Sequence, residues 1–569
     1  MKKFLISPWC LGVLVAFLPE KISSQNLEKI GKKDMITVSG GMNYNVVFYQ
    51  ADGFESRRDP FTWYFNGNLA INILDVSLPF TYSYSNLHGT YTQPFNMQSC
   101  NPKYKWAQAH IGTTAMSFSP YTLSGHIFTG AGIELNPDGF YFAAMYGRMN
   151  KAVAYDEVNN STENMSYKRM GYGAKIGFNK NGNSIGLNFF SAKDDASSLQ
   201  FIPPGANLSP AQNTAISISG KANFLHYFSA EGEYAVSGLT KNILSETEST
   251  DFNGFQKFLL PTKTTTQFFD ALKISAGIHF KKFSVNLNHE KVDPDYQTFG
   301  AYYFNNDLSS WTIAPAFHLF NGKLSLNLNS GWQKNNLDQT KLNTSRRIVG
   351  SANLVFIPST AWNFAAGYSD FTTFTNRRLQ SDPFWTPSPA DTLSFFQITQ
   401  QSNISIIHTF GKNTLKQTLT LIGNYQLTGM QQNLSGTSNT KVYNGNLSYT
   451  MNFTSKKISL SLLANYNHME SEIILTEMFG PGLQCSKTFV KGIRISAGSI
   501  YNRSYSQAIL TNNIISHRAQ FSWSPKMKKK IYGKPSLSLN AVYVNRFPVN
   551  SLQTKTGELT ATVNLGINF

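Results

Sequence analysis

Serine and histidine side chains near residue 120 are the groups in this sequence whose types and spacing could carry out catalysis. Two serines and two histidines lie close together there: His110, Ser117, Ser119 and His126. A serine hydroxyl beside a histidine is the nucleophile and base of many hydrolases. However, the sequence has no Gly-x-Ser-x-Gly motif and no acid nearby that can be assigned to orient either histidine. We therefore expect that the protein is not an enzyme, and we keep an intramembrane hydrolase as a minor alternative.

Cofactor and metal motifs are missing from the sequence. It contains no phosphate-binding glycine loop, no dinucleotide fingerprint and no zinc-ligand spacing. We therefore predict neither a cofactor nor a metal. The formal net charge of +17 could suggest nucleic acid, but the basic residues are scattered along the chain and do not form a patch. We expect no nucleic-acid partner and attribute the charge to contact with anionic lipid headgroups.

The first residues predict export. Met1–Ser24 has a basic start, an apolar middle at Phe4–Leu18 and a small-residue end, as in a secretory signal peptide. We expect the mature chain to begin near Gln25, with 25–34 as a short periplasmic segment. Cys100 and Cys485 then remain, and we place both in loops on the outer side. An oxidising compartment permits one disulfide between them, and two free thiols are the alternative.

Composition narrows the fold class. Of 569 residues, 41% are hydrophobic and only 14% are charged, and 43 Phe, 27 Tyr and 8 Trp make the chain rich in aromatic residues. Disordered chains have few aromatics, and ordinary soluble domains carry more charge. The longest nearly apolar run is also far shorter than the ~20 residues of a membrane-spanning helix. A β-barrel fits, because its strands alternate lipid-facing and lumen-facing residues and leave no hydropathy peak.

Alternation of apolar and polar residues predicts the strands that would position any site. In one hairpin the apolar residues are Leu447, Tyr449, Met451 and Phe453, followed by the turn Thr454–Lys457 and a second alternating strand. Short turns of this kind alternate with long polar connections along the chain, near 50–61, 87–104, 155–167, 191–213, 239–266, 292–308, 375–394 and 470–486. Short periplasmic turns and long extracellular loops are typical of outer-membrane barrels.

We therefore predict an all-β protein: a single large antiparallel transmembrane β-barrel at 35–569, with about 24 strands and a range of 22–26. The final strand places Leu565, Ile567 and Phe569 on one face, with an aromatic residue last. This pattern resembles the terminal strand that the barrel-assembly machinery recognises. The predicted location is the outer membrane, among its lipids and lipopolysaccharide.

A lumen this wide is either filled with water or closed by an inserted segment. Residues 107–130 contain Ser119-Pro120 and four glycines and lack clean alternation, so we predict a lumen constriction or plug there, with a bulged strand pair or a packed outer loop as alternatives. Five residues are candidates for the lumen or constriction: His110, His126, Arg148, Lys175 and Arg546. A lipid-facing charge costs about 2–4 kcal/mol at the membrane midplane, so the three basic residues should face the lumen or lie near a rim.

The N-terminal fifth of the chain resembles outer-membrane barrel proteins of the Bacteroidota. The matching pieces are Asn26–Gly31, Arg57–Phe61, Gln93–Asn96, Tyr104–Trp106, Met116–His126 and Ala144–Arg148. The resemblance implies fold and location and assigns no activity. We predict a porin-like passive or loop-gated channel for small polar, including anionic, solutes. The alternative is a plugged structural barrel docked with protein partners in an envelope or secretion complex.

Overall fold

The computed structural model describes residues 36–86, 96–157, 162, 164–206, 208–225, 227–247, 252–303, 305–340, 346–370, 373–375, 396–398, 400–431, 437–489, 492–525, 533–550 and 552–569. The predicted signal peptide and the segment 25–34 lie outside the described residues.

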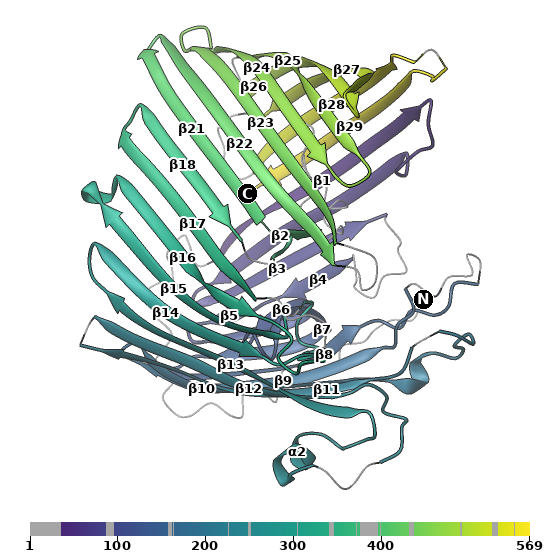
Figure 1. Ribbon diagram of the computed structural model, residues 1–569, viewed down its shortest axis with the longest axis vertical. Helices are drawn as coiled ribbons and strands as arrows, with labels where there is room; N and C mark the ends of the chain where they lie inside the picture. The colour runs from purple at the N-terminus through teal and green to yellow at the C-terminus, as the bar shows by residue number, and fades with distance from the viewer. Residues whose placement is uncertain are drawn as a thin grey trace.

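Within the described residues, one antiparallel sheet of 27 strands closes on itself, because its first strand pairs with its last. Figure 1 shows this wall as a continuous curved sheet of tilted strands. Two short strands, β4 and β5, share one place in the wall, since both pair with the same two neighbours. The wall therefore has 26 strand positions. This confirms the predicted single large antiparallel barrel, at the upper end of the predicted range.

The strands of the first part of the wall are β1 (Ile36–Asp52), β2 (Phe61–Ile73), β3 (Val76–Ser85), β4 (Met97–Cys100), β5 (Lys103–Tyr104), β6 (Ala107–Ser117), β7 (Ser124–Leu135), β8 (Phe140–Asn150), β9 (Arg169–Lys180), β10 (Asn183–Asp194), β11 (Gln212–Phe224), β12 (Phe228–Thr240), β13 (Thr266–His279), β14 (Phe283–Val292), β15 (Leu308–Leu319) and β16 (Leu324–Lys334).

The remaining wall strands are β17 (Arg346–Ser359), β18 (Trp362–Ser369), β21 (Gln400–Lys412), β22 (Leu415–Gln431), β23 (Thr437–Phe453), β24 (Ile458–Glu470), β25 (Leu475–Thr488), β26 (Ile493–Ser506), β27 (Ile509–Trp523), β28 (Lys534–Pro548) and β29 (Thr556–Asn568). A separate two-stranded sheet pairs β19 (Thr373–Thr375) with β20 (Phe396–Ile398).

Connections at the two ends of the barrel differ in length over most of the wall. The end at which β1 begins and β29 ends has tight turns, among them 74–75, 136–139, 181–182, 280–282, 360–361, 413–414 and 454–457. The opposite end carries 151–168, 195–211, 241–265 and 293–307, and the third of these contains helix α2 (Gly254–Leu259). No helix of the described residues is long and apolar enough to cross a membrane. The predicted asymmetry between short and long connections is therefore confirmed over this part of the barrel.

Two of the predicted long connections are wrong. Most of 470–486 is wall strand β25, and 97–104 holds β4 and β5. The turn-like residues Gly480-Pro481-Gly482 favoured a loop, because proline cannot donate to a strand ladder. In the structure Pro481 pairs with β24, and the register between β25 and β26 skips Gly480 and Pro481. The strand thus accommodates a proline by an interruption on one side only.

Cys100 and Cys485 also differ from their predicted positions. They lie in wall strands β4 and β25, whereas we placed them in outer loops, and both are free cysteines. Because the two strands are not neighbours in the wall, no disulfide joins these thiols. The predicted alternative of two free thiols holds.

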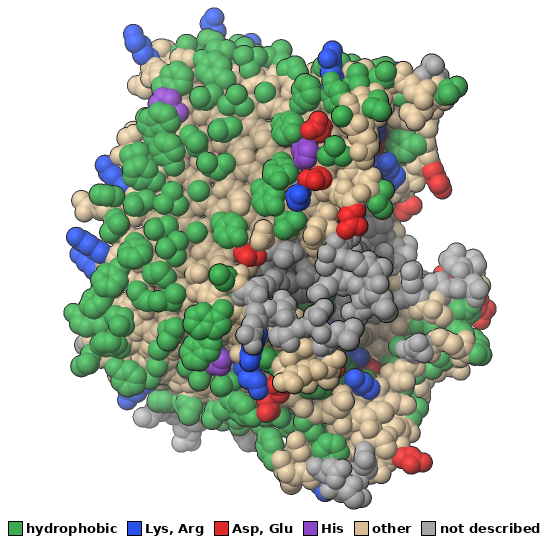
Figure 2. All heavy atoms as spheres, in the orientation of Figure 1, with side chains coloured by type: hydrophobic (Ala, Val, Ile, Leu, Met, Phe, Trp, Pro, Cys, Tyr) green, Lys and Arg blue, Asp and Glu red, His purple; other side chains and the backbone are tan. Residues whose placement is uncertain are grey.

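The wall has an apolar outer face and a largely polar inner face. On β23, for example, Leu447 pairs with Leu421 and Ala464, while Asn446 pairs with Ile422 and Asn465 on the other face. Figure 2 shows hydrophobic side chains spread over the outer surface of the wall. Exposed aromatic residues lie toward both ends of the strands: Phe178, Phe228, Phe283, Trp362, Phe410 and Trp523 at the short-turn end, and Tyr146, Trp311, Tyr368, Tyr443, Tyr466 and Phe479 toward the other.

Strand β29 closes the barrel against β1. Leu565 pairs with Tyr44 and Ile567 pairs with Met42. The backbone of Phe569 exchanges two hydrogen bonds with Gly40, of 3.0 Å and 2.9 Å. The side chains of Leu565, Ile567 and Phe569 are exposed, so the last strand presents one apolar face outward.

Candidate functional site in the barrel lumen

Residues 118–123 leave the wall between β6 and β7. The break follows from Ser119-Pro120, because proline lacks the N–H that a central strand needs. Phe118, Tyr121 and Leu123 are all buried. The inserted segment is therefore shorter than the predicted 107–130, because 107–117 and 124–130 belong to the wall strands β6 and β7.

Contacts of this segment with distant strands place it inside the lumen. Lys175 Nζ, on the inner face of β9, donates to the Phe118 carbonyl oxygen at 2.7 Å. Tyr121 Oη donates to Glu290 Oε1 of β14 at 2.7 Å. Ser217 of β11 hydrogen-bonds Ser119 through the hydroxyl oxygens at 3.3 Å. A connection between β6 and β7 reaches β14 only by crossing the inner face of the strands between them.

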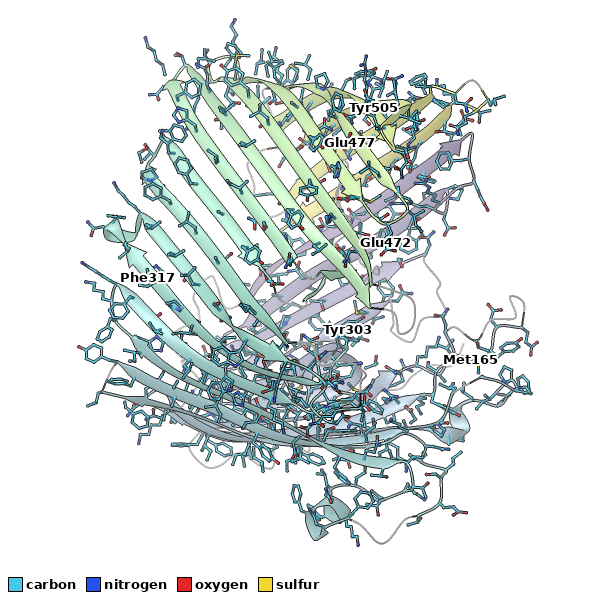
Figure 3. The ribbon with its side chains drawn as sticks, viewed as in Figure 1. Met165, Tyr303, Phe317, Glu472, Glu477 and Tyr505 are labelled. Carbon is cyan, nitrogen blue, oxygen red and sulfur yellow. The ribbon has the colours of Figure 1, made fainter. Side chains whose placement is uncertain are left out.

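The connection 293–303 packs against this segment, and we call the two together the inserted pair. Tyr296 Oη donates to the Tyr121 carbonyl at 2.8 Å, and Thr298 Oγ1 donates to the Thr122 carbonyl at 2.7 Å. At Gly300 a Cβ would lie 2.4 Å from the Thr122 carbonyl oxygen. Only glycine permits this close approach of two backbones. Figure 3 shows the crowding of side chains in this part of the barrel, where Tyr303 is labelled.

Polar side chains of the wall hold the connection 293–303 in place. Asn213 of β11 is fully buried; its Nδ2 donates to the Gln297 carbonyl at 3.2 Å, and its Oδ1 accepts from the Phe299 N–H at 3.0 Å. The Arg169 guanidinium lies 3.5 Å from the centre of the Phe299 ring and forms a bidentate pair with Asp194 at 2.7 Å and 3.0 Å. A buried amide with several partners fixes one arrangement, because each of its groups would otherwise lack a hydrogen bond.

The inserted pair buries apolar side chains against inward-facing apolar positions of the wall. One cluster contains Met116, Phe118, Leu123, Phe128, Ala143, Met145, Met149, Phe190, Ala192, Leu239 and Phe299. A second contains Tyr121, Ala235, Ala271, Val292, Tyr296 and Leu308. Each buried Phe or Leu contributes about 1.5–3 kcal/mol. These clusters explain why several inner positions of β8, β10 and β12 are apolar in a lumen predicted to be polar.

Two tyrosines of the inserted pair have altered acidity. Burial, followed by the charge and hydrogen bond of Glu290, raises the pKa of Tyr121 well above its usual value. Burial and the charge of Glu233 likewise raise the pKa of Tyr296. Both phenols are therefore neutral at physiological pH and can act as hydrogen-bond donors.

The predicted serine and histidine residues do not form a catalytic pair. Ser119 Oγ bonds to Thr122, Ser217 and the Tyr121 N–H. His126 stacks on Tyr302, with ring centres 4.2 Å apart, and its Nδ1 bonds the Ile127 carbonyl. His110 Nε2 lies 3.5 Å from Glu134 Oε1, close enough for an ion pair but without hydrogen-bond geometry. In the described part of the chain no hydrogen bond joins Ser117 or Ser119 to either histidine.

The predicted basic residues fall in three different places. Lys175 faces the lumen and contacts the inserted pair, as described above. Arg546 faces the lumen near the long-loop end of β28, where it pairs with Glu558 at 3.4 Å. Arg148 shares the outer face of β8 with the exposed Tyr146 and lies close to the strand end. Of the two predicted positions, lumen or rim, Arg148 takes the rim, because the alternation of β8 turns it outward.

Sequence reasoning missed further inward arginines. On β27, Arg518 Nε donates to Asn540 Oδ1 at 3.0 Å, and on β26 an Arg494 guanidinium nitrogen donates to Ser486 Oγ at 3.3 Å. Both alternate in phase with neutral polar residues of the inner face, which is the signal that could have identified them. Around them the lining is mostly hydroxyl and amide, including the bond from Asn465 Nδ2 to Asn502 Oδ1 at 3.0 Å.

Among the described residues, no group of three or more His, Cys, Asp or Glu side chains could hold a metal ion.

No protein-family model and no curated protein matches this sequence. The resemblance of the N-terminal fifth to Bacteroidota barrels therefore stays a prediction. Among solved structures, the chain is similar to the translocation pore of the P pilus usher PapC, with 11% identity, 93% of this chain and 99% of that chain covered, and a TM-score of 0.36.

Two further structures are similar. A mutant of the ferric enterobactin receptor PfeA of Pseudomonas aeruginosa has 10% identity and a TM-score of 0.40, and the match covers 94% of this chain and 80% of the receptor chain. OccAB4 of Acinetobacter baumannii has 9% identity and a TM-score of 0.30, and the match covers 68% of this chain and 97% of OccAB4. At these values the similarities assign neither a family nor a function.

Proposed function

We propose that this chain is an outer-membrane channel through which small polar solutes pass, with a preference for anions. The observation that carries the proposal is a closed wall whose outer face is apolar between two sets of exposed aromatic residues and whose inner face is polar and carries arginines.

The spacing of the aromatic residues supports the membrane location. On β23 the outward positions run from Tyr443 near one end to Phe453 at the other. Ten residues at ~3.3 Å each, in a strand tilted by roughly 40°, span about 25 Å of height, which is the thickness of the apolar band of outer-membrane barrels. Aromatic residues at both edges of such a band are typical of membrane interfaces.

The lining of the second part of the wall supports the anion preference. Arg494, Arg518 and Arg546 face inward from β26, β27 and β28, and Glu558 is the carboxylate that pairs with one of them. Around them are neutral amides and hydroxyls. A ring or patch of basic side chains in a pore favours anions. The inserted pair narrows the opposite side of the lumen, over β8 to β15.

A liposome-swelling assay tests the proposal. The purified protein is reconstituted into liposomes, which are then placed in isotonic solutions of a neutral sugar, a sugar acid and an amino sugar of similar size. We expect swelling with all three solutes, fastest with the sugar acid. The channel proposal fails if folded protein gives the same rate as protein-free liposomes.

A variant lacking residues 118–123 separates the two main alternatives. If only this variant allows swelling, the native barrel is plugged, and a structural role with protein partners in the envelope replaces the channel. We also propose that assembly of the barrel uses the terminal strand with Phe569 and that outer-membrane lipid and lipopolysaccharide surround the wall.

A further inference from the structure

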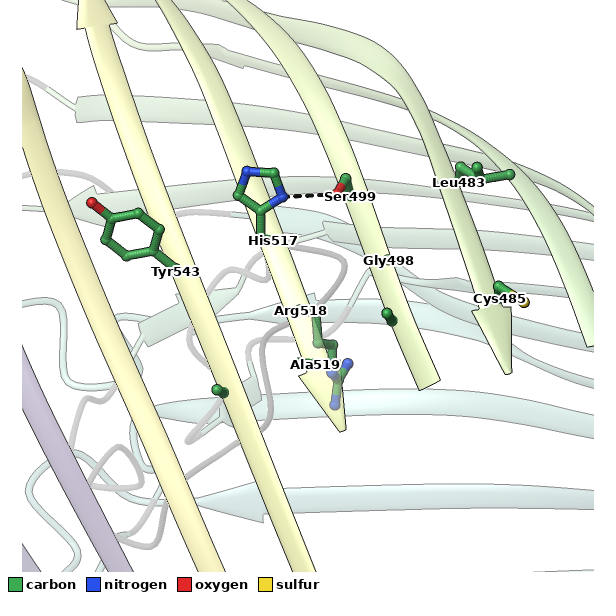
Figure 4. A pocket seen from close by; sticks show the side chains of 10 residues that line it. Leu483, Cys485, Gly498, Ser499, His517, Arg518, Ala519 and Tyr543 are labelled. Atoms are coloured by element: carbon green, nitrogen blue, oxygen red, sulfur yellow. Dashed lines mark hydrogen bonds between the residues drawn. The ribbon is translucent and has the colours of Figure 1, made fainter. Parts of the chain in front are cut away.

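A shallow groove crosses the outer face of β25 to β28. Its floor is a row of small side chains that are paired across the strands: Cys485, Ala497, Ala519 and Ala541. Leu483 and Tyr543 stand above this row, and both are more than one third exposed on the outer surface. Figure 4 shows the groove with these side chains. Because the neighbouring rows are larger, the small residues form a channel on a surface that faces acyl chains.

The row above the floor carries a polar pair. His517 Nδ1 and Ser499 Oγ are 2.8 Å apart and hydrogen-bonded, and both side chains are exposed on the outer face. Among the described residues no hydrogen bond reaches His517 Nε2. Whichever tautomer is present, the pair keeps one N–H or O–H donor without a protein partner. In an apolar surrounding such a donor favours a bound carbonyl oxygen, because it finds no water there.

A cation lies on the same face of β26, toward the end of the barrel with long connections. Arg503 is two outward positions above Ser499, and its Nε lies 3.5 Å from Tyr501 Oη. Two outward positions correspond to about 13 Å of strand. The Tyr501 hydroxyl reaches Asn513, which is paired with Arg503, so this contact lies at the level of the arginine. Within the part of the chain that the structure describes, Arg503 forms no ion pair with a carboxylate. Its guanidinium is also hydrogen-bonded to Tyr505, so its contacts are with neutral phenols. A phosphate is the anion that its planar donors fit.

From this arrangement we propose that the outer face of β25 to β28 is a specific binding site for one anionic diacyl glycerophospholipid. Arg503 binds the phosphate, the Ser499–His517 pair binds an ester carbonyl of the acyl linkage, and the row of small residues receives an acyl chain. The order of cation, donor pair and apolar groove along the surface matches the order of phosphate, ester and chain in such a lipid.

The structure assigns binding and not ester cleavage to this site. A serine–histidine pair that acts as nucleophile and base needs a third group to orient the histidine. No carboxylate is hydrogen-bonded to His517 among the described residues. Cys485 contributes only a small side chain to the groove floor.

Native mass spectrometry of the full protein in detergent tests the proposal. The protein is titrated with four lipids: dioleoylphosphatidylglycerol, dioleoylphosphatidylcholine, lipid A and the diether analogue of phosphatidylglycerol, which has no ester carbonyl. We expect one tight adduct with the first lipid and weaker adducts with the other three. Equal affinity for all four, or tighter binding of lipid A than of phosphatidylglycerol, would overturn the assignment.

Four variants locate the site. Arg503→Gln should weaken the phosphatidylglycerol adduct about tenfold, as expected for one lost charge-assisted contact. His517→Phe should remove the preference for the ester over the ether. Ala519→Leu fills the groove and should abolish the tight adduct, whereas the matched control Ala366→Leu, on the outer face of β18, should leave it unchanged. The assignment is wrong if Ala519→Leu and Ala366→Leu bind the lipid equally.

The inference rests on the proposed membrane location but not on conduction. Lipid binding is read in detergent, so a failure here leaves the swelling result untouched, and a barrel that does not conduct can still retain the lipid.

Discussion

The hydrogen bond from Tyr121 to Glu290 offers a direct test of how the inserted pair is held. It joins a connection between β6 and β7 to the inner face of β14, with the oxygen atoms 2.7 Å apart. Tyr121 is 2% exposed, so the Tyr121→Phe variant removes a donor that water cannot easily replace. We expect the variant to keep the barrel and to loosen residues 118–123.

The expected size follows from the type of bond. A hydrogen bond to a charged group contributes about 1.5–3 kcal/mol. Since 1.36 kcal/mol corresponds to a factor of ten, the equilibrium between the inserted segment and its locally open form should shift by about 10- to 150-fold toward the open form.

Hydrogen exchange measured by mass spectrometry reports this equilibrium. The Phe118 N–H bonds the Leu123 carbonyl at 2.8 Å, so a peptide covering 116–126 contains a protected amide that depends on the segment. Its protection should fall by the factor given above in Tyr121→Phe. Tyr368→Phe, an exposed tyrosine of β18, is the control and should leave the protection of this peptide unchanged.

A double-mutant cycle decides whether the bond itself is responsible. Glu290→Gln and the double variant are measured in the same way, and the two changes should be coupled by more than 1 kcal/mol. Full protection in Tyr121→Phe, or strict additivity of the two single changes, would refute the account of how the segment is held.

Other predictions concern pH, selectivity and assembly. The pKa values of Tyr121 and Tyr296 are raised, so their contribution to the stability of the inserted pair is complete below the usual tyrosine pKa of about 10 and is lost as the pH rises through the raised values. Current fluctuations of the channel should therefore increase only above the usual tyrosine pKa. The increase should be smaller in a variant in which both tyrosines are replaced by Phe. Arg518→Glu should move the reversal potential in a salt gradient toward cation preference, and the change should be larger when Arg546→Glu is added. Phe569→Ala should lower the yield of folded barrel, seen as loss of the heat-modifiable band on a gel, and an unchanged yield would remove the terminal residue from the assembly signal.

Much of the wall could be predicted from the sequence because its physical rule is local. A strand between lipid and a polar lumen alternates with a period of two, and the hairpin around Thr454–Lys457 shows that period without a break. The prediction failed where a local signal conflicted with the wall. Pro481 indicated a loop, yet β25 continues through it because only one of its two ladders needs the missing N–H.

The lumen site could be predicted only in part because its contacts are long-range. Ser119-Pro120 indicates that the chain leaves the wall, but nothing local to it indicates Glu290 or Tyr296 as partners, which lie about 170 residues away. Arg148 shows a case that local pattern decides. Its charge left the lumen and the rim as alternatives, and the alternation with Tyr146 in β8 places it on the outer face near the rim.

Single-channel recording in a planar bilayer tests the central claim, that this barrel conducts small ions with a preference for anions, most directly. For the purified protein we predict stable current steps and a reversal potential that favours chloride over potassium, reduced in Arg518→Glu. A silent bilayer containing protein that is demonstrably folded and inserted, or a clear preference for cations in the unaltered protein, would contradict it.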